Sequence, residues 1–201
     1  MTQLELRWSL IPACVFGYLR GFKGEQSYYG PAFGSGVYCF VHSNGVRYQV
    51  YYIGQSKEVG SRLAQHYQDY TRTHPDYWLP LDASLYDGDI YEEFQKESGF
   101  AQESAKFPNQ IRQRVGRQIM DKTYFAFATV EQAMLGVAEA TLQFSVLKRH
   151  GLAKKGYLGE KMSQLPQEEL VITQSFPNVV VEKMVTSSIP SEIRVSDGKL
   201  M

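Results

Sequence analysis

Hydrophobic and polar positions change their spacing along the chain, and these changes predict its elements. Two runs rich in Val, Tyr and Phe, Gly36 to His42 and Val46 to Ile53, flank the turn signal Ser43-Asn44-Gly45. Because such runs favour strands and Asn-Gly favours a tight turn, they predict a β-hairpin. Residues 1 to 35 contain a Gly- and Tyr-rich loop from Gly21 to Gly36, and we expect them to be irregular.

The length of the hairpin loop decides which side chains share a face of the sheet. A two-residue loop, Asn44-Gly45, would place Tyr38 and Tyr52 on opposite faces. A three-residue loop with Gly45 in the left-handed conformation would place both rings on one face. If the two tyrosines serve one site, we expect the three-residue loop.

A helix is expected from Lys57 to Tyr70, with Ser56 as its N-cap. On this helix Arg62 and His66 stand four residues apart, one above the other. Further along the chain we expect a short helix over 90–96, a basic helix over 107–121 and a third strand over 122–130. A helix should then run from Thr129 to about His150, with Thr129 and Gln132 as its capping pair. The last expected element is a β-pair of 170–174 with 179–184.

These elements predict an α+β fold built on a small three-stranded antiparallel sheet, in the order β-hairpin, helix, strand, helix, and flanked by helices. The central domain would span residues 36–156, with a long insertion at about 71–121 before the third strand. Residues 1–35 would form an N-terminal extension, and residues 157–201 a C-terminal extension that contains β-structure.

The composition is that of an ordinary globular protein, with 43% hydrophobic and 21% charged residues and a net charge of zero. A neutral chain is not a nonspecific nucleic-acid coat, although a nuclease needs a positive charge only where it meets phosphate. No run approaches transmembrane length, and Glu5 and Arg7 leave too short an apolar stretch before Cys14 for a signal peptide. A soluble, cytoplasmic protein without a membrane partner is expected.

Glu139 is the most informative single residue. It is the only charged side chain between Ala133 and Leu147, in a helix that is apolar on nearly every face. A carboxylate in such a place needs a partner, which is either a salt bridge to Arg62 or Lys122 or a bound metal ion.

Several residues that carry little information alone form a pattern together. Gly36-Val37-Tyr38 is followed after thirteen residues by Tyr52-Ile53-Gly54, then by Arg62 eight positions later and His66 four further on. This order and spacing resemble the signature of the GIY-YIG nucleases. In that family a hairpin carries the two tripeptides, the next helix carries the arginine, and a later helix carries a metal-binding glutamate, which Glu139 matches.

The resemblance implies metal-dependent hydrolysis of phosphodiester bonds. Glu139 would hold one Mg²⁺ or Mn²⁺ ion, because hard cations prefer oxygen ligands. Arg62 would donate to phosphate oxygens in fork geometry. Tyr38 would activate or position the attacking water, with Tyr52 and His66 ordering the site. The resemblance leaves open whether Tyr38 or His66 takes the proton.

The sequence departs from the family pattern in two places. Family members commonly carry an Asn soon after the glutamate helix, and residues 148–156 hold none. The insertion is also longer than the minimal module needs, and long loops in compact domains are often functional. The candidate nucleic-acid contacts are Arg112, Arg114, Arg117, Lys154 and Lys155.

The leading hypothesis is therefore a DNA endonuclease of restriction, phage-related or repair type, acting on double-stranded DNA. A homodimer would suit the cutting of both strands of a symmetric target. The alternatives are a nucleic-acid-binding module that keeps the fold without catalysis, and a structural protein whose resemblance is accidental.

Overall fold

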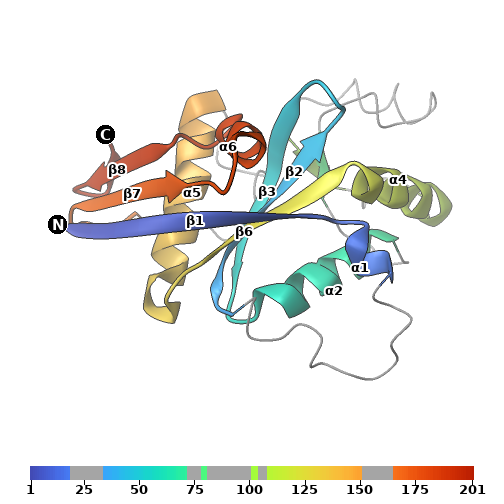
Figure 1. The fold of residues 1–201 in the computed structure, drawn as a ribbon, viewed down its shortest axis with the longest axis horizontal. Coiled ribbons are helices and arrows are strands. Elements are labelled where there is room, and N and C mark those ends of the chain that lie inside the picture. Colours follow the sequence, from blue (N-terminus) through green and yellow to red (C-terminus); the bar gives the residue numbers. More distant parts are fainter. Residues whose placement is uncertain (19–33, 72–77, 81–100, 104–107, 151–164) are drawn as a thin grey trace.

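The computed structural model describes residues 1–18, 34–71, 78–80, 101–103, 108–150 and 165–201 (Figure 1). Its centre is a curled, mixed sheet of seven strands in the order β3-β2-β6-β1-β7-β8-β9. The strands are β1 (Thr2–Pro12), β2 (Gly36–Ser43), β3 (Tyr48–Ser56), β6 (Thr123–Thr129), β7 (Leu170–Ser175), β8 (Glu192–Ser196) and β9 (Lys199–Leu200). The prediction of a small three-stranded sheet is therefore wrong.

The part of the sheet that was not predicted begins with β1, which lies between β6 and β7. Thr2 to Arg7 pair in parallel with β7, and Trp8 to Pro12 pair antiparallel with β6. One strand thus joins the hairpin side of the sheet to the C-terminal strands, and residues 2–12 are not irregular as expected. The signal was an alternation of period two, in which Leu6 and Trp8 are buried while their neighbours face solvent.

The hairpin formed by β2 and β3 is confirmed, but its loop is not the expected one. The last pair is Ser43 with Tyr48, so the loop contains four residues, with Gly45 at φ +87°. The register then shifts at a β-bulge between the pairs Phe40–Tyr52 and Val41–Val50. A bulge opposes two residues to one and restores the parity that the loop alone would lose. Tyr38 and Tyr52 therefore share one face.

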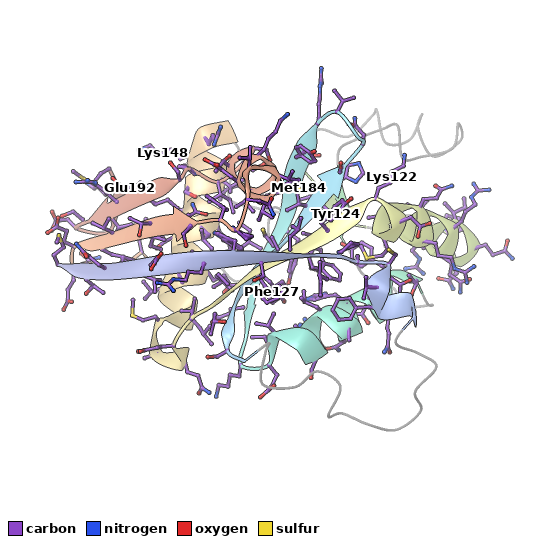
Figure 2. The ribbon with its side chains drawn as sticks, in the orientation of Figure 1. Lys122, Tyr124, Phe127, Lys148, Met184 and Glu192 are labelled. Atoms are coloured by element: carbon purple, nitrogen blue, oxygen red, sulfur yellow. The ribbon has the colours of Figure 1, made fainter. Side chains whose placement is uncertain are left out.

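Two helices hold this end of the sheet from different sides. Helix α2 (Val59–Thr71) places His66 against the rings of Tyr38 and Tyr52, on one face of the hairpin. Helix α5 (Leu135–His150) lies along β3, the edge strand, where the Gln143 side chain donates a hydrogen bond to the carbonyl oxygen of Ile53. At the far end of α5, Lys148 donates to the carbonyls of Leu200 and Met201 and so ties the helix to the C-terminal strands (Figure 2).

The start of α5 differs from the prediction. Residues Gln132–Met134 form a short 3₁₀ helix whose N-cap residue, Glu131, makes no side-chain capping bond, and the α-helix begins only at Leu135. Thr129 is still in strand β6, where it pairs with Gly36. Strand pairing with Gly36 therefore keeps Thr129 in β6, so that Thr129 does not cap the helix as its sequence context predicted.

The expected strand over 179–184 is also wrong, because α6 (Val179–Thr186) is a helix. Its valines favour a strand, but the Asn178 side chain caps a helix by accepting hydrogen bonds from the backbone of Val180 and Val181. Val181, Met184 and Val185 then form a buried stripe at helical spacing.

The third strand and the basic helix are confirmed as β6 and α4 (Asn109–Asp121). The remaining elements are α1 (Val15–Tyr18) and a separate pair, β4 (Trp78–Pro80) with β5 (Ala101–Glu103). The short helix expected over 90–96 lies outside the described residues. None of the helices in the described ranges has the length and apolar character that crossing a membrane requires.

Candidate active site

Gly54 explains how Tyr38, on an inner strand, reaches the edge of the sheet. Tyr38 pairs directly with Gly54 across the hairpin. A Cβ atom at Gly54 would lie 2.6 Å from the Tyr38 hydroxyl oxygen and 3.0 Å from the Tyr52 ring. Contacts that short do not occur between real side chains, so the phenol of Tyr38 occupies the space that a side chain at position 54 would fill.

The two tyrosines belong to an aromatic cluster that also contains Phe40 and His66. The ring centres lie 6.1 Å apart for Tyr38 and Tyr52, 4.8 Å for Phe40 and Tyr52, and 5.3 Å for Tyr52 and His66. The Tyr38 hydroxyl lies 2.9 Å from Nε2 of His66, within hydrogen-bond distance. The cluster therefore fixes both phenol rings by packing, and fixes the Tyr38 hydroxyl by a directed contact as well.

Burial keeps this cluster uncharged. Burial, aided by the Arg62 charge, lowers the pKa of His66 to about 3, so the imidazole is neutral at neutral pH. In the tautomer that is protonated at Nδ1, Nε2 can accept a hydrogen bond from the Tyr38 hydroxyl. Burial also raises the pKa of Tyr38 well above its ordinary value of 10.0, even though Arg62 acts in the opposite direction. Tyr38 is therefore a protonated phenol in contact with a neutral imidazole, and the tautomer of His66 decides which of the two donates.

Arg62 brings the positive charge to the open side of the cluster. Its side chain is half-buried, donates through Nη1 to Gln65 at 2.6 Å, and lies close enough to Tyr38 and Tyr52 to act against the rise in the pKa of both phenols. A guanidinium has five N–H donors in a rigid fork. Its position beside two phenol oxygens suits an anion bound at the same place.

Glu139 approaches the same end of β3 from α5. Its carboxylate is half-buried, lies close enough to Tyr52 to raise the pKa of that phenol, and lies close enough to the Gln55 side chain for that group to act against the rise in its own pKa. Burial raises the pKa of Glu139 from 4.5 to about 7. No salt bridge joins Glu139 to Arg62 or Lys122, both described by the structure, so the salt-bridge alternative is not what the structure holds.

The residues around Glu139 fit one kind of metal site. Within the described ranges there is no group of three or more His, Cys, Asp or Glu side chains, so an all-protein cage is not built there. A magnesium ion usually keeps several waters and takes one or two carboxylates. A half-buried carboxylate with a raised pKa and no cationic partner among Arg62 and Lys122 matches that requirement.

The structure brings Tyr38, Tyr52, Arg62, His66 and Glu139 to one end of β3, but it does not bring in every predicted residue. Arg114 and Arg117 are exposed on α4, and Arg112 donates to Asn109 of its own helix. Helix α4 packs against α2, on the side away from α5 (Figure 1). Lys154 and Lys155 lie outside the described residues. Asn178 caps α6, so it does not replace the missing family Asn.

Two residues of the site were not among the predicted site residues, although Gln55 belongs to the segment that resembles the family. Gln55 follows Tyr-Ile-Gly directly, and the alternation of a strand places it on the face opposite Tyr52 and toward α5. Gln143 is four residues after Glu139 on a buried helix, and this spacing was the available signal.

Comparison of the chain with protein-family models, with curated proteins and with solved structures found no match.

Proposed function

We propose that this chain is a metal-dependent nuclease of the GIY-YIG type, which hydrolyses phosphodiester bonds in double-stranded DNA. One observation carries the proposal: Tyr38 and Tyr52 pack beside Gly54, His66 and Arg62 lie next to these two tyrosines, and the lone acid of α5 lies near Tyr52 at the same end of β3. These residues come from three separate segments of the chain. Chance resemblance along the sequence would not bring them together in space.

Arg62 would bind the scissile phosphate. Its fork of donors can hold two non-bridging oxygens, and charge-assisted hydrogen bonds of this kind are about twice as strong as neutral ones. The Tyr38 and Tyr52 hydroxyls, which lie near Arg62, would lie at the edge of the same anion site. The phosphate would then be fixed between α2 and the hairpin.

Tyr38 and His66 would position the attacking water. With the neutral His66 protonated at Nδ1, the Tyr38 proton would be held toward Nε2, which would leave a lone pair of the phenol oxygen free to accept a hydrogen bond from water. Because burial opposes charge on both groups, neither is a strong base by itself. Tyr38 and His66 would together orient the water. As the attack proceeds, a proton would move from the water toward His66.

Glu139 would hold the cation, with Gln55 orienting its carboxylate. A divalent cation at that position supplies the positive charge that lowers the pKa of water and stabilises the leaving oxygen. The raised pKa of Glu139 makes the site ready for a cation, because binding relieves an unpaired, partly buried negative charge.

The test is cleavage of supercoiled plasmid and of linear duplex DNA, with and without Mg²⁺ or Mn²⁺. Wild-type protein should nick or cut DNA only with the metal present, and Glu139→Gln should abolish this activity. Glu131→Gln, an exposed acid just before α5, is the matched control and should cleave normally. Metal-independent binding without cleavage of any of these substrates would favour the non-catalytic binding module instead.

A further inference from the structure

Helix α5 contacts β3 at two points, and the distance between these points along the helix matches the distance between them along the strand. The Glu139 carboxylate lies close enough to the Gln55 side chain for that group to lower its pKa, and Gln143 donates through Nε2 to the Ile53 carbonyl at 3.2 Å. Four residues of α-helix rise about 6 Å, and two residues of strand rise about 6.6 Å. The two contacts can therefore form at once only in one register of helix against strand.

The Gln143 contact is also directed at the reacting end of the strand. Ile53 lies between Tyr52 and Gly54, and β3 is an edge strand among the strands that the structure describes, so the Ile53 carbonyl that Gln143 meets has no described strand to bond on that side. Gln143 is 1% exposed. A polar side chain buried to that extent on an apolar helix needs a specific partner, and here the partner is the backbone of the signature tripeptide.

We propose that Gln143 is a positioning residue that sets the height of the Glu139 carboxylate along β3, and that Gln55 is the second half of this clamp. The inference rests on the proposed nuclease function and deepens it. Gln143 touches neither phosphate nor cation. It acts through α5, by keeping the carboxylate one turn away opposite Gln55 and beside the tyrosines.

The direct test measures the clamp without any catalysis. In a ¹⁵N-labelled protein, the side-chain amide resonances of Gln55 report its contact with Glu139, and Glu139→Ala gives their position when that contact is lost. Gln143→Met keeps the volume of residue 143 and removes its donor, so these resonances should move toward the Glu139→Ala position. Unchanged Gln55 resonances in Gln143→Met would overturn the inference, whether or not the protein cleaves DNA.

Thr141→Val is the matched control. Thr141 lies between Glu139 and Gln143 on the same helix, is fully buried, and its hydroxyl has no hydrogen-bond partner among the described residues. Removing an unpaired hydroxyl does not weaken a fold. The variant should leave the Gln55 resonances, the Mn²⁺ affinity and the cleavage rate unchanged. Shifts equal to those of Gln143→Met would show a general disturbance of α5 and overturn the inference.

Metal binding and kinetics give the second readout. Gln143→Met and Gln55→Met should each weaken Mn²⁺ binding about tenfold or more, measured by calorimetry without DNA, since groups that orient a metal ligand typically contribute that much. The value of kcat should fall by a similar factor, while KM for DNA should stay constant because Arg62 is untouched. If both variants bind Mn²⁺ and turn over DNA as well as the wild-type protein does, the proposed positioning role of Gln143 and Gln55 is refuted. Failure of the wild-type protein to bind Mn²⁺ or cleave DNA, with Gln55 resonances still dependent on Gln143, would refute the nuclease proposal alone.

Discussion

Replacing Glu139 by Gln should stabilise the fold while it destroys activity. The carboxylate is half-buried beside Tyr52, with a pKa raised from 4.5 to about 7 by burial. Gln has nearly the same shape and can still accept a hydrogen bond from Gln55, but it carries no charge. The variant therefore removes an unfavourable charge without removing a packing partner, as is common where function conflicts with stability.

The sign and the size of the effect follow from the two pKa values. Between pH 4.5 and 7 the folded chain keeps a proton that the unfolded chain has lost, so wild-type stability falls as pH rises through this range and stays lower above it. The full shift would be worth about 3 kcal/mol. Because the carboxylate keeps contact with solvent, we reduce this to about 1–2 kcal/mol. The variant should gain this amount at pH 8 and little of it at pH 5.

The assay is thermal or urea unfolding of both proteins in EDTA, at pH 5 and at pH 8. At pH 8 the Tm of Glu139→Gln should exceed that of wild type by roughly 3–6 °C, since 1 kcal/mol shifts a chain of this size by about 2–4 °C. Addition of Mg²⁺ should then raise the Tm of wild type only. A variant that is less stable than wild type at pH 8, or a difference that does not change with pH, would refute the burial argument.

Three further predictions concern the hairpin and the pH dependence. Gly54→Ala places a Cβ 2.6 Å from the Tyr38 hydroxyl, so it should displace that ring and abolish plasmid cleavage while a cooperative thermal transition remains. Gly36→Ala instead meets the Ala128 carbonyl of β6 at 2.3 Å; it should lower the free energy of unfolding by about 1–3 kcal/mol or more in urea titrations, and a loss as small as that of a surface substitution would contradict this contact. The cleavage rate at limiting Mg²⁺ should rise to a plateau above about pH 7, because Glu139 must lose its proton to bind the ion; a rate that is flat from pH 6 to 8 would exclude Glu139 as the ligand.

The elements that the sequence predicted correctly are those whose signals are local. The hairpin, α2, α4 and β6 each combine a clear period with a turn or breaker at the boundary. Strand β1 has the same alternation, but its partners lie more than a hundred residues away in β6 and β7. The pattern of residues 2–12 alone does not distinguish an edge strand, a central strand and a solvated segment. The seven-stranded sheet could therefore not be inferred from the hairpin.

The site was predictable where spacing along one element decides the geometry. Arg62 and His66 share a helix face, and Tyr38 lies opposite Gly54, because helices and hairpins fix such relations locally. The contact of Gln143 with Ile53 depends on how α5 is placed against an edge strand. Nothing within either segment specifies that placement, so it was accessible only from the fold.

The bulge in β3 shows how a correct inference about the shared face of Tyr38 and Tyr52 came from a wrong expectation of the loop length. We expected a three-residue loop because both tyrosines had to share a face; the chain uses a four-residue loop and corrects the parity at Tyr51. A bulge turns two successive side chains toward the same side, and the rings of Tyr51 and Tyr52 both contact Phe40. Tyr51 is fully buried and hydrogen-bonds to Thr123 at 3.0 Å, so it anchors the hairpin to β6, while Tyr52 remains at the site. The requirement that both phenols face Arg62 thus constrains the register of the strand ends. The loop length can vary, as long as an extra bulged residue between the loop and the tripeptide restores that register.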